Sequence, residues 1–136
     1  MKIFLICSKS FYTRIPDIVV ELKKAGHQLT MPNCYDAPHT EDSYREKSQK
    51  EHAAWKSEMI RKSEKTIAEH DAVLVLNFEK NGIANYIGGA TFLEMYDAFR
   101  LGKKIFVYND LPQGSLKDEL MGFQPVILHC QLENID

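Results

Sequence analysis

The chain has 136 residues and a mass of 15.7 kDa, enough for one domain with a sizeable hydrophobic core. Hydrophobic residues make up 44%, charged residues 26%, and the formal net charge is −2, which argues against binding to a nucleic-acid polymer or an anionic membrane surface. The amino-terminal apolar run, Ile3 to Cys7, is too short for a signal sequence or a membrane span. The three widely spaced cysteines contain no C-x-x-C pair and indicate reduced thiols, so we expect a cytoplasmic protein without a membrane partner.

The first half of the chain alternates short apolar runs with helical patterns. Residues 2–7 and 27–31 predict strands, and residues 11–25 between them predict a helix that ends at Gly26. Pro32 ends the second strand, and residues 34–40 are rich in turn formers. The polar segment 41–70 has a helical composition, which predicts one long helix or two shorter ones.

The second half repeats the alternation and defines the expected fold class. Residues 71–77 predict a central strand, 89–100 a helix stopped by Gly102, 105–108 a strand, 116–121 a short helix and 125–128 a fifth strand. This order predicts an α/β fold: a single three-layer domain over residues 1–136, with a five-stranded parallel sheet in the flavodoxin- or Rossmann-like order 2-1-3-4-5 and helices on both faces. Ligands of such sheets bind at the carboxyl ends of the strands, here between the first and third.

The loop after the first predicted strand carries polar side chains suited to an anion. Ser8, Lys9 and Ser10 could hold a phosphate through two hydroxyls and an ammonium, with Tyr12 close behind. An N-capping serine in an ordinary loop accounts for the same residues equally well. Neither a Walker loop nor the dinucleotide fingerprint G-x-G-x-x-G occurs in the chain.

The junction between the third strand and the following helix is the most informative segment. A glycine pair there lets a ligand approach backbone N–H groups closely, and Glu94 follows one turn inside the helix. A carboxylate aimed at a small-molecule crevice is a candidate nucleophile or base. Around this candidate catalytic residue we predict further substrate-binding positions at Asn77, Asn85, Gly88, Gly89 and Asp97.

Glu94 also fits a structural role. Thr91 and Glu94 match the S/T-x-x-E capping box, in which the glutamate closes the helix start. Helical geometry argues partly against this role, because Glu94 projects almost opposite an apolar stripe made of Phe92, Met95, Tyr96 and Phe99.

The remaining candidate groups carry weaker signals. The five histidines lack spacings such as H-x-x-x-H, so we expect neither a metal nor a cofactor. Trp55 could form an aromatic wall of the crevice, although a role as a core anchor is the simpler explanation.

These residues together carry a family resemblance. The pattern from Lys2 to Pro32, the strand at 71–76, the run Gly88-Gly89 to Glu94 and the ending Gly102-Lys103 resemble the nucleoside 2-deoxyribosyltransferase superfamily, which includes the 2′-deoxynucleoside 5′-phosphate N-hydrolases. The resemblance covers most of the chain, but the segment between Asn33 and Asp71 matches only in being largely helical.

The resemblance implies a mechanism and a partner. The glutamate matching Glu94 attacks C1′ of the sugar, and water or a second base resolves the covalent glycosyl-enzyme. Polar groups of the first loop would hold the sugar or its 5′ group. Relatives complete their sites with residues of a neighbouring subunit, which implies a homodimer or higher homo-oligomer.

The sequence departs from the family pattern at three places. Family members carry an acid for the leaving base where this chain has Ser63, transferases often have a second acid where it has Gly88, and some have a tyrosine where it has Phe4-Leu5. The primary hypothesis, which the resemblance implies, is N-glycosidic cleavage or transfer on a nucleoside or nucleotide. The alternatives are a non-catalytic nucleotide- or nucleotide-sugar-binding module and, from fold class alone, a flavin binder.

Overall fold

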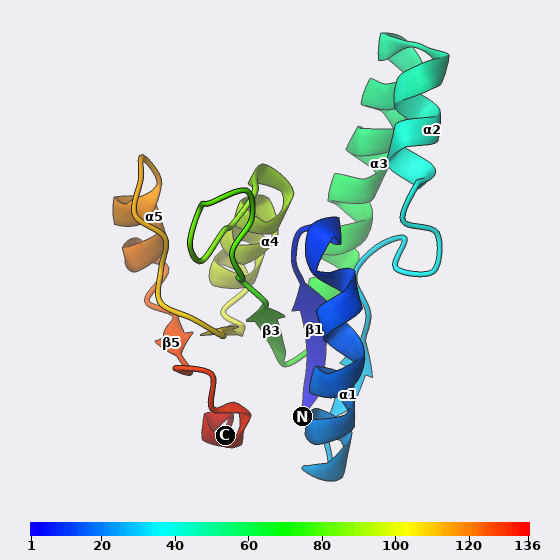
Figure 1. Ribbon diagram of the computed structural model, residues 1–136. Coiled ribbons are helices and arrows are strands. Elements are labelled where there is room, and N and C mark those ends of the chain that lie inside the picture. The colour runs from blue at the N-terminus through cyan, green and yellow to red at the C-terminus, as the bar shows by residue number, and fades with distance from the viewer.

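A computed structural model describes residues 1–136 and shows an α/β architecture (Figure 1). One sheet contains all five strands, which are parallel and follow the order β2-β1-β3-β4-β5. The strands are β1 (Lys2–Ile6), β2 (Gln28–Thr30), β3 (Ala72–Val75), β4 (Lys104–Val107) and β5 (Val126–Ile127). The helices are α1 (Ile15–Lys24), α2 (Thr40–Lys47), α3 (Gln49–Ala68), α4 (Gly89–Arg100) and α5 (Lys117–Gly122), with 3₁₀ turns η1 (Lys9–Arg14) and η2 (Leu132–Asn134). The predicted fold class and strand order are confirmed.

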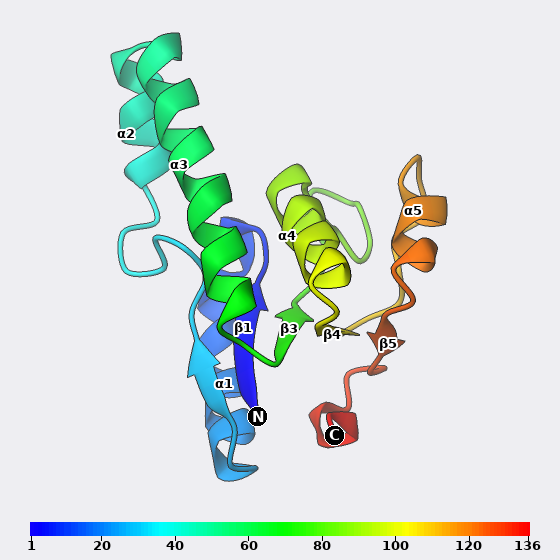
Figure 2. The same ribbon diagram turned by 180° about the vertical axis from the view of Figure 1, so that it is seen from behind.

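The sheet is covered on both faces, which is why its central strands are continuous apolar runs. One face packs against α1 and the carboxyl-terminal segment, through residues such as Leu5, Ile15 and Leu132. The other face packs against α3, α4 and α5, through residues such as Ile67 and Met95. The two views of the ribbon show these layers from opposite sides (Figures 1 and 2). Successive side chains along each strand point to opposite faces of the sheet and therefore pack into two separate hydrophobic cores.

One predicted helix is divided in the structure, and the polar segment 41–70 follows the two-helix alternative. The segment predicted as one helix over residues 11–25 is a 3₁₀ turn followed by α1, whose first turn contains Pro16. The polar segment 41–70 forms two helices, because Ser48 adopts an extended backbone with φ −171° and its hydroxyl accepts a hydrogen bond from the Glu51 amide. Ser48 thus ends α2 and caps α3.

The hairpin of α2 and α3 extends past the sheet. Both helices rise above the carboxyl ends of the strands (Figures 1 and 2), and α2 contains no buried residue. No helix combines the length and the apolar character needed to cross a bilayer.

Candidate functional site

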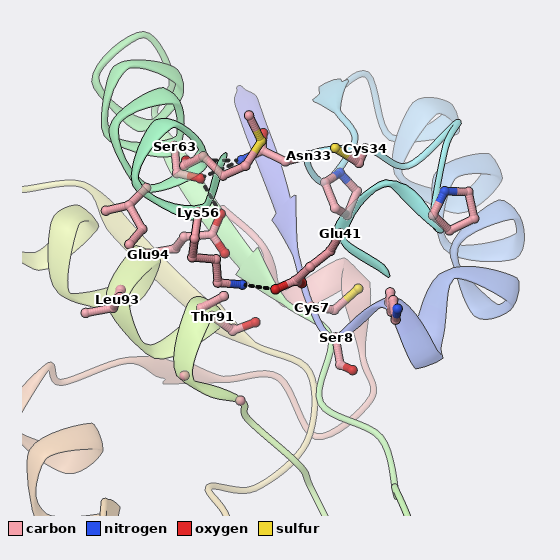
Figure 3. A pocket seen from close by; sticks show the side chains of 18 of the residues that line it. Cys7, Ser8, Asn33, Cys34, Glu41, Lys56, Ser63, Thr91, Leu93 and Glu94 are labelled. Carbon is pink, nitrogen blue, oxygen red and sulfur yellow. Dashed lines mark hydrogen bonds and ion pairs between the residues drawn. The ribbon is translucent and has the colours of Figure 1, made fainter. Parts of the chain in front are cut away.

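A cavity of about 350 Å³ opens at the carboxyl ends of the strands, where the strand order predicts a crevice. Three stretches of chain form its wall: the loop after β1, the segment from Pro32 to Ser63, and the segment from Lys80 to Asp97 (Figure 3). The loop after β4 contributes nothing to it. The cavity is therefore built around β1 and β3 together with the α2–α3 hairpin.

The start of α4 presents its backbone to this cavity. Gly88 is the N-cap residue, and no side chain caps the helix. Thr91 lies inside the first turn and is buried, so the capping box predicted from Thr91 and Glu94 is not formed. The predicted apolar stripe is present, because Phe92, Tyr96 and Phe99 all contact the Phe123 ring. Two of its members, Tyr96 and Phe99, are 46% and 49% exposed. Glu94 is therefore free to serve the cavity instead of closing its own helix.

Glu94 is held by a hydrogen bond from the neighbouring helix. Ser63, only 4% exposed on α3, donates from Oγ to Glu94 Oε2 at 2.8 Å, and Asn33 Nδ2 donates to Ser63 Oγ at 2.8 Å (Figure 3). Burial raises the pKa of Glu94 to about 7, with the Ser63 hydrogen bond opposing it and the Asp97 carboxylate adding to it. A carboxylate poised near neutrality in a cavity is a candidate for chemistry.

Cys7 lies in the same cavity but is poorly suited to be its nucleophile. Burial, with a smaller contribution from Glu94, raises the pKa of the Cys7 thiol to about 12. The residue is therefore a thiol at neutral pH and not the reactive thiolate. Tyr12 next to it donates from its hydroxyl to the Asn33 carbonyl at 3.1 Å, and burial raises its pKa as well.

Asp97 also lines the cavity, one turn after Glu94 on α4. Its side chain is 13% exposed, and Arg100 Nη2 lies 3.4 Å from its Oδ1. Burial raises the pKa of Asp97, against the hydrogen bond from Arg100. Glu64 on α3 lies at the same distance, 3.4 Å, from Arg100 and shares that cation.

Two lysines at the cavity are neutralised by acids on α2. Lys9 Nζ lies 2.9 Å from Asp42 Oδ2, and Lys56 Nζ lies 3.1 Å from Glu41 Oε2. Burial would raise the pKa of Glu41, but hydrogen bonds from His52 and Lys56 outweigh it and hold that pKa below its ordinary value. These pairs join α2 to the loop after β1 and to α3.

A third lysine has no such partner. Lys80 Nζ donates to Ser8 Oγ at 3.2 Å and lies 4.6 Å from the centre of the Tyr86 ring. It forms no ion pair with a carboxylate, although it lines the same cavity. A positive charge that the protein does not neutralise is available to an anionic ligand.

The α2–α3 hairpin supplies an aromatic side of the cavity. Trp55 on α3 lines the cavity and stacks against Tyr44 on α2, with ring centroids 5.8 Å apart and an interplanar angle of 18°. Trp55 belongs to neither buried core cluster, so the simpler expectation of a core anchor is wrong. Its position in the wall is the alternative that the sequence left open.

The structure brings together most of the predicted site residues and separates the rest. The cavity is lined by Glu94 and by six of the nine predicted substrate-binding residues: Ser8, Lys9, Tyr12, Gly88, Gly89 and Asp97. Ser10, Asn77 and Asn85 lie outside it. Asn77 is fully buried, and its amide joins the ends of β3 and β4 through hydrogen bonds with Asn109 and Asp110.

No sequence motif marks several of the residues that line the cavity or contact its lining. Asn33 and Ser63 have no motif and lie 30 positions apart. Lys56 is one charge among many in a polar helix, and Lys80 lies in the strand-to-helix junction without a motif around it. The one available signal was the position of Ser63, where the family resemblance places an acid. Contact between these residues arises only when α3 packs beside α4.

The site and fold define a class: an α/β protein of flavodoxin-like strand order with a carboxylate in the crevice at its strand ends. No protein-family model matches the chain, and no curated protein or solved structure compared with it matches either. Membership of the nucleoside 2-deoxyribosyltransferase superfamily therefore stays a prediction.

Proposed function

We propose that this protein cleaves or transfers the N-glycosidic bond of a nucleoside or nucleotide, with Glu94 as the nucleophile. The observation that carries the proposal is the Glu94 carboxylate held by Ser63 at the wall of a ligand-sized cavity. Burial raises its pKa to about 7, which supports a role in chemistry. The ionised carboxylate would form an ester bond to C1′ while the bond from C1′ to the base nitrogen breaks and its electron pair leaves with the base. Water or a second base would then displace Glu94.

The remaining cavity wall is suited to the other parts of such a substrate. Trp55 offers a flat aromatic surface to a base, an interaction worth about 1–3 kcal/mol. Lys80 and Ser8, together with the uncapped amino terminus of α4, favour an anionic group such as a 5′-phosphate. We therefore expect a nucleoside monophosphate to bind more tightly than the matching nucleoside.

The nucleobase leaves readily only if it is protonated as the bond to C1′ breaks, or if it is a good leaving group without protonation. Ser63 cannot supply that proton, because its hydroxyl donates to Glu94 and has no acidity in the neutral range. This favours substrates with good leaving groups. It also supports the second candidate, a nucleotide-binding module that does not turn its ligand over.

The test is a screen of nucleosides and nucleoside monophosphates in which the released base is measured by chromatography. We expect release by the wild type, a loss of at least about 100-fold in Glu94→Gln, and a mass increase on Glu94 when the reaction is quenched early. Glu58→Gln is the matched control, because Glu58 is exposed on α3 and lies outside the cavity. Full activity in a folded Glu94→Gln variant would refute the proposal.

Calorimetry separates the second candidate from the first. Saturable binding of a nucleotide without base release would support the binding module, whereas turnover at enzyme-like rates would exclude it.

We also expect a homodimer or higher oligomer, since Leu93, Tyr96 and Phe99 give α4 an exposed apolar surface. Light scattering of the purified protein measures that state.

A further inference from the structure

When Glu94 is ionised, the hydrogen bonds from Asn33 to Ser63 and from Ser63 to Glu94 have a fixed direction, because the carboxylate can only accept. A serine hydroxyl has one proton. Because Ser63 Oγ accepts a hydrogen bond from Asn33 Nδ2 at 2.8 Å, its own proton is directed to Glu94 Oε2, also at 2.8 Å. We call this arrangement of Asn33, Ser63 and Glu94 the relay. It joins the loop after β2, the carboxyl-terminal half of α3 and the first turns of α4.

The orientation of the Asn33 amide is supported by a second contact. The Met59 carbonyl oxygen lies 3.5 Å from Asn33 Nδ2, so an amide turned the other way would set two acceptor oxygens against each other. Tyr12 holds the same residue by donating to its backbone carbonyl at 3.1 Å. The donor end of the relay is therefore fixed from two sides.

The two oxygens of Glu94 have different environments. Oε2 accepts from Ser63, whereas Oε1 has no hydrogen-bond partner in the protein. Every fully buried side-chain oxygen and nitrogen has a hydrogen-bond partner, so the unpartnered Oε1 is not fully buried, and Glu94 lines the cavity. The relay thus occupies one oxygen and leaves the other for a ligand.

We propose that Asn33 and Ser63 are positioning residues that act through this one-way relay, holding Glu94 ionised with Oε1 open to the cavity. A hydrogen bond donated to the charged form of an acid favours that form. Burial and the Asp97 carboxylate disfavour the ionised form, whereas the Lys56 ammonium favours it. The relay therefore lowers the pH above which Glu94 can act, a role that extends the proposed function and rests on it.

The direct test is a pH titration of the Glu94 side-chain carboxyl carbon by NMR, in protein labelled with ¹³C glutamate. Ser63→Cys keeps the shape of the side chain but replaces a strong donor with a weak one, and Ser63→Ala removes the donor. We expect the Glu94 pKa to rise by about one unit in both variants. Ser63→Thr, which keeps the hydroxyl, should retain the wild-type value. An unchanged pKa in Ser63→Cys and Ser63→Ala would overturn the proposal.

A second comparison tests the direction of the relay. In Asn33→Asp the new carboxylate accepts the Ser63 proton and turns it away from Glu94, and its negative charge also raises the Glu94 pKa. In the Ser63→Ala background only the charge effect remains. The shift caused by Asn33→Asp should therefore be larger with Ser63 present than without it, and equal shifts would refute a one-way relay.

These titrations need no substrate, so they stand apart from the proposed function. If Glu94 is the nucleophile, the acid limb of kcat/KM should move by the same number of pH units as the NMR titration in each variant. An NMR shift without a matching kinetic shift would keep the relay and reject Glu94 as the nucleophile. If Ser63 had only a structural role, its replacement would lower stability but leave the NMR pKa of Glu94 and the acid limb of kcat/KM unchanged.

Discussion

Replacing Glu94 with glutamine should stabilise the protein at alkaline pH and leave its stability at acid pH nearly unchanged. The folded protein raises the pKa of Glu94 from 4.5 to about 7, so between these values the native state holds a proton that the unfolded chain has released. Stability therefore falls as the pH rises through this window. Above it, the ionised Glu94 costs about 3 kcal/mol relative to a neutral group, at about 1.4 kcal/mol per pH unit. Glutamine avoids that cost because its amide oxygen can still accept from Ser63.

The assay is urea unfolding of the wild type and Glu94→Gln at several pH values from 4 to 8.5. Groups shared by both proteins cancel in the difference between their free energies of unfolding. We expect that difference to be near zero at pH 4 and to grow to about 3 kcal/mol in favour of glutamine above pH 7. Glu58→Gln should show no such trend, since Glu58 is exposed. A difference that is constant with pH, or that favours the wild type at pH 8, would refute the argument.

Three further substitutions test other parts of the site. Lys80→Met should weaken binding of a nucleoside monophosphate by about 10- to 100-fold by calorimetry, and binding of the nucleoside much less, because Lys80 has no carboxylate partner. Trp55→Ala should weaken binding of any base by about tenfold, with little loss of stability, because Tyr44 stacks on Trp55 outside the core. Asn77→Ala should cost about 2–4 kcal/mol in urea unfolding and leave activity per folded molecule unchanged, because its buried amide links β3 to β4. The role of Lys80 would be contradicted if Lys80→Met weakened binding of the nucleoside and its monophosphate equally. The role of Trp55 would be contradicted by unaltered binding in Trp55→Ala, and that of Asn77 by a stable but inactive Asn77→Ala variant.

The fold could be predicted because the signal for a buried parallel sheet is strong along the chain. The runs Ile3–Ile6 and Ala72–Val75 are fully buried, so every residue in them must be apolar. Boundaries were harder to predict. The 3₁₀ turn before α1 and the break at Ser48 depend on backbone geometry that helical periodicity does not encode.

The candidate site could be predicted only where one short segment carries it. Gly88, Gly89 and Glu94 belong to a single strand-to-helix junction, and the sheet topology fixes where that junction lies. The predicted capping box is not formed because the N-cap of α4 is Gly88, three residues before Thr91, and a glycine offers no side chain. Ser63 reaches Glu94 through packing of two helices, a contact that no local pattern reveals.

Helix α2 forms one side of the cavity without burying a residue of its own. Its attachments include the pair of Asp42 with Lys9, the contacts of Glu41 with Lys56 and His52, and the stacking of Tyr44 on Trp55. Exposed ion pairs weaken as salt shortens the Debye length, whereas the packed sheet is insensitive to it. Backbone amides of α2 should therefore exchange with deuterium first, and faster as ionic strength rises. Salt concentration then becomes an external control on how open the crevice is, with the strands beneath it unchanged.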